Sequence, residues 1–215
     1  MIVMRKALLA LFAFACTGLL QAQMISAPGI NFLKAEYGHT FSYTEIGRSF
    51  SGFRAVGFGG YSFNTGEGKS LEAEVVLLNQ LLKRWNNEDS QANISIGGGV
   101  GRGRSGGREG WAGTLSAQAD WEDRHWHIML QEQAVFVPSA SRLASTLMGG
   151  WAPWLAEYDE WAPWIYWTLQ HENGQWNGLT HGPSLVLMHQ DLLLELRVMH
   201  SNHGYHAEAG IRSLF

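Results

Sequence analysis

The C-terminal part of the chain alternates between apolar and polar positions. From Tyr205 to Phe215, small, apolar or aromatic residues hold one set of alternate positions, while His206, Glu208 and Arg212 fall on the other. Successive side chains of a β-strand point to opposite faces, so this period of two predicts a strand between two different environments. Turn-forming residues at 190–191 and 201–204 divide the segment 179–215 into a meander of three antiparallel strands.

Pairing the last two strands around the turn at 201–204 predicts the register. Arg197 then lies opposite Glu208, and the apolar positions of 192–198 share a face with Ala207 and Ile211. Charges on one face and leucines on the other fit a wall with a polar inside and a lipid outside. The residues predicted to point into the interior are Glu195, Arg197, Glu208 and Arg212.

Tryptophans recur at the ends of predicted strands. Trp111 and Trp121 bound an apolar face of eleven alternating residues, which matches a membrane-crossing strand of about 9–11 residues with an aromatic at each interface. The tetrapeptide Trp-Ala-Pro-Trp occurs at 151–154 and again at 161–164, which indicates a bend with tryptophans at one rim. The residues predicted to lie at the membrane interfaces are Trp111, Trp121, Trp151, Trp154, Trp161, Trp164 and Phe215.

The N-terminal half is less regular. Residues 31–44 alternate as one strand, and the glycine-rich segment 102–110 is expected to be a loop. Segment 70–85 fits a strand with Leu71 and Val75 outward and Glu72 and Glu74 inward, but it also fits an amphipathic helix. We favour the strand.

Composition supports a membrane barrel. Charged residues make up 16% of the chain, with 26 glycines and 10 tryptophans, whereas about 25% is usual for charged residues in soluble domains. The pattern gives eleven strands if 70–85 is one of them and ten if it is not, and a bacterial barrel has an even number of strands. We predict an all-β fold, an antiparallel up-and-down transmembrane β-barrel of ten strands, with twelve as the next choice. A soluble exported β-sandwich is the competing fold, because it would bury the leucine face against a second sheet.

The first 22 residues resemble a secretory signal peptide. Arg5 and Lys6 precede an uncharged apolar run at 7–20, which is too short to span a membrane, and a cut is expected after Ala22. The mature domain is therefore predicted at 23–215, without Cys16 and with more negative charge than the −4 of the whole chain. This charge argues against a nucleic-acid partner.

The aromatic end of the last strand resembles the closing strand of bacterial outer-membrane β-barrels. Phe215 is the last residue of the predicted strand. The resemblance implies location in the outer membrane, contact with outer-membrane lipid, and recognition of this strand by the barrel-assembly machinery.

Histidine and methionine gather in the last third of the chain, and this suggests a metal site. His181 is predicted to pair with His200, next to Met199. Imidazole and thioether are suitable ligands for copper or silver. Histidines in solvent at the barrel rims are the alternative, and we expect no cofactor.

The stretch His200-Ser201-Asn202, with Glu208 downstream, resembles the motif of PagL-type lipid A deacylases. The resemblance implies that Ser201 would be the nucleophile, His200 the base and Glu208 the orienting acid. This chain departs from the family because His200 and Ser201 are adjacent, and adjacent residues of a strand point apart. The sequence favours a non-enzymatic structural or narrow-passage role in the envelope, with lipid A modification and copper or silver handling as alternatives.

Overall fold

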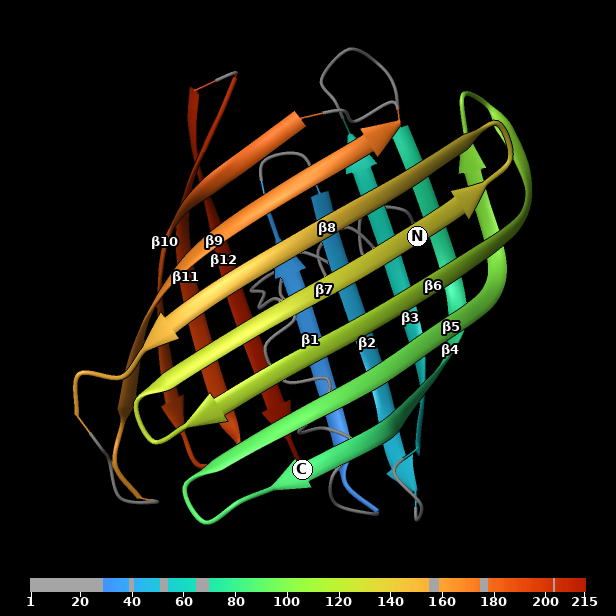
Figure 1. Ribbon diagram of the computed structural model, residues 1–215. Coiled ribbons are helices and arrows are strands. Elements are labelled where there is room, and N and C mark those ends of the chain that lie inside the picture. The colour runs from blue at the N-terminus through green and yellow to red at the C-terminus, as the bar shows by residue number, and fades with distance from the viewer. Residues whose placement is uncertain are drawn as a thin grey trace.

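A computed structural model describes residues 29–38, 41–50, 54–64, 70–154, 159–174, 178–202 and 204–215. They form a barrel of strands that are inclined to its axis, most visibly β6 to β9 (Figure 1). The strands are β1 (Asn31–Tyr37), β2 (Phe41–Phe50), β3 (Arg54–Asn64), β4 (Ser70–Asn86), β5 (Ser90–Ser105), β6 (Arg108–Asp123), β7 (Trp126–Val137), β8 (Ala140–Trp151), β9 (Ala162–Gly174), β10 (Gly178–His189), β11 (Leu192–Ser201) and β12 (Gly204–Leu214). No helix in these residues is long and apolar enough to cross a membrane.

Each strand pairs antiparallel with its neighbours in sequence, and β1 pairs with β12 to close the barrel. The seam ends with two backbone hydrogen bonds between Asn31 and Phe215, at 2.9 and 3.0 Å. The all-β antiparallel barrel predicted from the sequence is confirmed. The prediction of ten strands is wrong, and the alternative of twelve is confirmed.

The strand count failed at the beginning of the barrel. The segment 31–44, expected to be one strand, is two: β1 ends at Tyr37 and β2 begins at Phe41. The Gly38 amide donates to the Phe41 carbonyl at 2.8 Å. Alternation runs through the segment 37–41 without a Pro or an Asn-Gly pair, so a single glycine was the only turn signal.

Residues 70–86 form strand β4, so the strand interpretation is confirmed and the helical alternative is wrong. The faces, however, are reversed: Leu71 and Val75 are fully buried inside, and Glu72 faces outward in an ion pair with Arg104, at 2.8 Å. Both faces of β4 carry apolar residues, because Val76 and Leu78 are exposed on the outer side. Alternation alone therefore could not assign the inner face.

The predicted loop at 102–110 is also wrong. Strand β5 continues to Ser105, and β6 begins at Arg108 after a two-residue turn. Gly106 and Gly107 have φ values of +56° and +77°, the conformation of a type I′ hairpin turn, which glycine adopts readily. The glycines serve the turn and the close pairing of the strands.

The outer surface is apolar along most of the strands. Exposed side chains include Leu115 on β6, Ile128 on β7 and Leu196 on β11, whereas buried polar and charged residues lie inside. This distribution is the reverse of that in a water-soluble barrel and matches the lipid-facing and lumen-facing sides of outer-membrane barrels.

Candidate functional site: the polar lumen

The interior has an apolar side and a polar side. A cluster of buried apolar residues lines β2, β3 and β4, together with parts of β6 and β7. Ionised side chains line β8, β9, β11, β12 and β1. A second and a third apolar cluster lie on β7–β11 and on β1, β3 and β4. Aromatic rings and charged side chains therefore face one another across the interior.

Arg197 organises the ionic network on β11 and β12. Its guanidinium lies 3.3 Å from Glu195 and 3.4 Å from Glu208, and Arg197 and Glu208 are direct cross-strand partners. His206 lies 3.2 Å from the other carboxylate oxygen of Glu208. All three charged residues are buried. Inside a barrel, such groups are stabilised only when their charges are matched, and the alternation of acid and base along this wall matches them.

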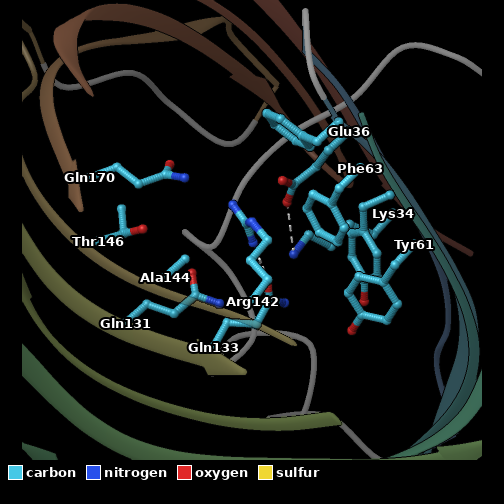
Figure 2. A pocket seen from close by; sticks show the side chains of 12 residues that line it. Lys34, Glu36, Tyr61, Phe63, Gln131, Gln133, Arg142, Ala144, Thr146 and Gln170 are labelled. Atoms are coloured by element: carbon cyan, nitrogen blue, oxygen red, sulfur yellow. Dashed lines mark hydrogen bonds and ion pairs between the residues drawn. The ribbon is translucent and has the colours of Figure 1, made fainter. Parts of the chain in front are cut away.

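Arg142 on β8 forms the central contact of the lumen. Its guanidinium binds both carboxylate oxygens of Glu172 on β9, with the Nε–Oε2 distance at 3.1 Å. It also lies 4.2 Å from the ring centroid of Phe63 and 3.5 Å from Oε1 of Gln133. Figure 2 shows Arg142 between the glutamines of β7 and the aromatic rings. The guanidinium thus spans the interior from β9 to β3.

Lys34 and the aromatic rings form the opposite side of this constriction. Lys34 lies 3.0 Å from Glu36 and 4.8 Å from the ring centroid of Tyr43. The Tyr43 hydroxyl donates to Glu45, which also accepts from Asn79 at 3.2 Å. The rings of Tyr43, Tyr61, Phe63 and Phe41 follow one another in contact along β2 and β3.

Between these two sides lies a cavity of about 40 Å³. It is lined by Lys34, Glu36, Phe41, Tyr43, Tyr61, Phe63, Gln131, Gln133, Arg142, Ala144, Thr146 and Gln170. A buried water needs about 10–15 Å³ of such volume, so the cavity holds about three waters.

A further polar network lies on β5, β6 and β7. Asp120 accepts from Asn93 at 2.8 Å and from Gln118 at 3.0 Å. On the neighbouring strands, His127 and the Tyr166 hydroxyl lie 3.2 Å apart. The polar lining therefore continues from the constriction toward the end of the barrel where β1 begins and β12 ends.

The lumen carries more acidic than basic groups. Among the described residues, the charged side chains that point into the lumen include Lys34, Arg84, Arg142, Arg197 and Arg212 against Glu36, Glu45, Asp120, Glu122, Glu172, Glu195 and Glu208. In a water-filled lumen such an excess of carboxylates would attract cations.

The sequence-predicted interior residues are all found inside. Glu195, Arg197, Glu208 and Arg212 are at most 7% exposed. Arg197 faces Glu208 in the predicted register, because Ser201 pairs with Gly204 as the predicted turn at 201–204 requires.

The predicted interfacial aromatics lie on the outer surface with one exception. Trp111, Trp121, Trp151, Trp154, Trp161 and Phe215 are 38–84% exposed. Trp164 instead points inward, 9% exposed, and stacks on Tyr166 at a centroid distance of 5.9 Å. The prediction for Trp164 is wrong because Trp164 shares the inner face of β9 with the buried residues Tyr166 and Thr168.

The proposed metal ligands are divided by the barrel wall. His181 and His200 are cross-strand partners with ring centroids 5.4 Å apart, as expected. Both occupy outward positions, between Trp167 and Tyr205, whereas Met199 is fully buried inside. Among the residues that the structure describes, no group of three or more His, Cys, Asp or Glu is placed to hold a metal.

The residues of the deacylase-like stretch are also divided. His200 contacts the exposed ring of Tyr205 outside, while Glu208 lies inside beside His206. The Ser201 hydroxyl donates to the Gly204 carbonyl at 3.3 Å. Strand alternation places His200 on the outer face and Ser201 on the inner face, so the wall separates the predicted base from the predicted nucleophile.

Sequence reasoning missed the constriction residues Arg142, Glu172, Lys34 and Glu36. The alternation of 34 and 36 with apolar neighbours was visible, but it did not say which residues would face them across the barrel. Arg142 stands among serines, alanines and leucines at 139–147, and an isolated arginine in an apolar strand is the signal that could have indicated a lumen site.

Comparison with protein-family models gives no match, and comparison with curated proteins gives none either. Among solved structures, the chain is similar to the KdgM porin in complex with disordered oligogalacturonate, with a TM-score of 0.52 and 11% identity. The alignment covers 86% of this chain and 99% of that chain. A second KdgM porin structure gives a TM-score of 0.51 at the same identity and coverage. At this identity the likeness shows the fold: a small closed barrel of the kind found in the KdgM porin.

Proposed function

We propose that the protein is a small channel of the outer membrane, with a narrow passage for water, cations and small polar solutes. The observation that carries the proposal is the difference between the two faces of the barrel wall. Leucines and tryptophans are exposed on the outer face, and ionised side chains line the inner face. Such a wall is stable with lipid outside and water inside. The likeness to a porin supports a channel of this size.

The constriction supports a passage that is narrower than a sugar porin. Arg142 and the rings of Tyr61 and Phe63 approach from opposite walls and leave a cavity of about 40 Å³ (Figure 2). Closely spaced acidic and basic groups create a local field across the lumen, and the excess of carboxylates favours cations. A polyanion such as oligogalacturonate, which the KdgM porin binds, suits this lining less well.

Conductance in planar bilayers tests the proposal. The purified, folded protein is expected to give a small conductance, and a KCl gradient should give a reversal potential of the sign for cation preference. Glu36→Gln, which leaves Lys34 without its carboxylate partner, should shift the reversal potential toward anions. Glu72→Gln is the matched control, because Glu72 is an outward-facing carboxylate paired with Arg104, and it should leave the potential unchanged. A folded barrel without conductance, or with anion preference, would overturn the proposal.

The location in the outer membrane, with removal of residues 1–22, belongs to the same proposal. Fractionation should place the protein with the outer membrane, and its intact mass should correspond to a chain starting at Gln23. Deleting Phe215 removes two backbone hydrogen bonds of the seam and the aromatic end that we expect the barrel-assembly machinery to recognise, so assembly should slow. A protein that stays soluble without detergent would contradict the location.

A further inference from the structure

Three polar side chains form a row on the outer surface of β7, β8 and β9. Glu132 is the cross-strand partner of Ser145, and Ser145 is the partner of His171. The Ser145 hydroxyl donates to Glu132 Oε2 at 2.7 Å. We call these three residues the Glu132 patch.

The parity of the strands shows that the patch faces outward. Leu130 on β7, Leu147 on β8 and Leu169 on β9 are two residues away from the three patch members, on the same faces, and they are 39–48% exposed. The His171 side chain is itself exposed. The patch therefore belongs to the surface that we propose to contact lipid.

Glu132 also lies near the middle of its strand. It is six residues from the exposed Trp126 at one end of β7 and four from the exposed Phe136 near the other. The outward pair Glu72–Arg104, in contrast, lies close to the ends of β4 and β5 and is neutralised by its ion pair. The cross-strand neighbours of Glu132 are Ala117 and Ser145, neither of which carries a compensating charge.

Lipid cannot satisfy the Glu132 carboxylate at this depth. Acyl chains provide no hydrogen-bond donor, and headgroups lie at the interfaces, away from the middle of the wall. Ionisable residues within the membrane are costly and are generally turned toward a protein partner or a water-filled cavity. The side chains beside Glu132 are small, as in Ala117, Ala119 and Ala134, and small residues let membrane segments approach closely.

We propose that the Glu132 patch is the contact between two copies of this chain, side by side in the membrane. The proposal rests on the membrane location given above. A second copy inserted in the same orientation carries its own patch at the same depth in the membrane, so the two patches can meet. A two-fold axis along the membrane normal also reverses the row, which brings the Glu132 side of one patch against the His171 side of the other. The patch carries both an acidic and a basic member and is therefore self-complementary, as a two-fold interface requires.

Cysteine cross-linking in the membrane tests the contact. In a Cys16→Ser background, Ser145→Cys places a thiol at the middle of the row, on the proposed two-fold axis, and Leu196→Cys places one on the exposed face of β11. Oxidation of membranes should give a disulfide-linked dimer for Ser145→Cys and little for Leu196→Cys. Equal cross-linking of the two variants, or none in either, would overturn the proposal.

A charge exchange separates this contact from a general loss of stability. Glu132→Leu and His171→Leu should each weaken the dimer in mild detergent, as measured by sedimentation, by about tenfold. The double variant Glu132→His/His171→Glu should restore it, because the two-fold contact works in either direction. A wild-type protein that stays monomeric, or single variants that leave the dimer unchanged, would contradict the proposal. Fractionation and a shift in gel mobility on boiling report separately whether each variant is a folded membrane barrel, so failure of the dimer is distinct from failure of the location.

Discussion

Arg142 on β8 binds both carboxylate oxygens of Glu172 on β9, and its guanidinium lies 4.2 Å from the ring centroid of Phe63 on the opposite wall. The contact crosses the lumen beside the cavity that Lys34 and the aromatic rings line. A planar guanidinium held by two hydrogen bonds has little freedom to move aside. The size of the passage therefore depends on this side chain.

Arg142→Ala is predicted to widen the passage and destabilise the barrel. The single-channel conductance should rise, because the side chain between Phe63 and Gln133 is removed. The free energy of unfolding should fall by about 3–5 kcal/mol, since Glu172 loses its charged partner in a buried place. Denaturant titration in detergent micelles measures the stability, and planar bilayers measure the conductance.

The control for this variant is the pair Arg142→Lys and Arg142→Ala/Glu172→Gln. Lysine keeps the positive charge but cannot form the bidentate ion pair with Glu172. The conductance should therefore rise only slightly. The double variant should regain part of the lost stability while its conductance stays high. An Arg142→Ala variant with unchanged conductance would show that the passage does not run beside this residue.

Arg197→Ala is predicted to be among the most destabilising single changes on β11. Its removal takes away the cation that lies within 3.4 Å of the buried Glu195 and Glu208, at a cost of about 3–5 kcal/mol. Leu196→Ala, the neighbouring residue on the lipid side, should cost less, because its side chain remains largely exposed in the folded barrel. A comparison of the two unfolding midpoints checks the assignment of inner and outer faces.

Gly182→Ala is predicted to disturb the pairing of β10 with β11. A Cβ at this position would stand 1.9 Å from the Val198 carbonyl oxygen, a backbone atom that cannot turn away. The expected loss is about 1–3 kcal/mol. At Gly149 a Cβ meets nothing within 4 Å, so Gly149→Ala should leave the melting temperature nearly unchanged. Equal effects in the two variants would contradict the packing described for β10.

Tryptophan fluorescence distinguishes the two faces of the wall. Variants that keep a single tryptophan at Trp151 or at Trp164 can be placed in bilayers with brominated lipids. Trp151, which is 41% exposed, should be quenched, and Trp164, which lies inside against Tyr166, should not. Quenching of Trp164 to the same degree would mean that β9 has the opposite parity.

Strand alternation was enough to predict the architecture and the C-terminal face assignment. On β11 and β12 the two faces differ sharply, because leucine and alanine alternate with charged residues, and the pairing of Ser201 with Gly204 sets the register. Alternation failed where both faces have a similar character, as on β4, and where a single glycine was the only turn signal, as after Tyr37. It also misplaced Trp164, whose partners on neighbouring strands determine the direction of its side chain.

The constriction could not be predicted, for a different reason. Lys34 on β1 and Arg142 on β8 line the same cavity only because the barrel closes. Periodicity describes one strand at a time and says nothing of what lies across a lumen. The same holds for Glu132 and His171, whose positions on one surface follow from the strand registers.

The seam between β1 and β12 has a consequence for how the protein folds. Its hydrogen bonds join Asn31 to Phe215, two residues near opposite ends of the sequence, while the other strand pairs form between neighbours in the chain. Hairpins can form early, because they close short loops, but the last contact must wait until all the others have brought the edges together. Until then both edge strands expose unpaired backbone groups and invite pairing with another chain. Before closure, the edges of β1 and β12 would therefore need protection from pairing with other chains.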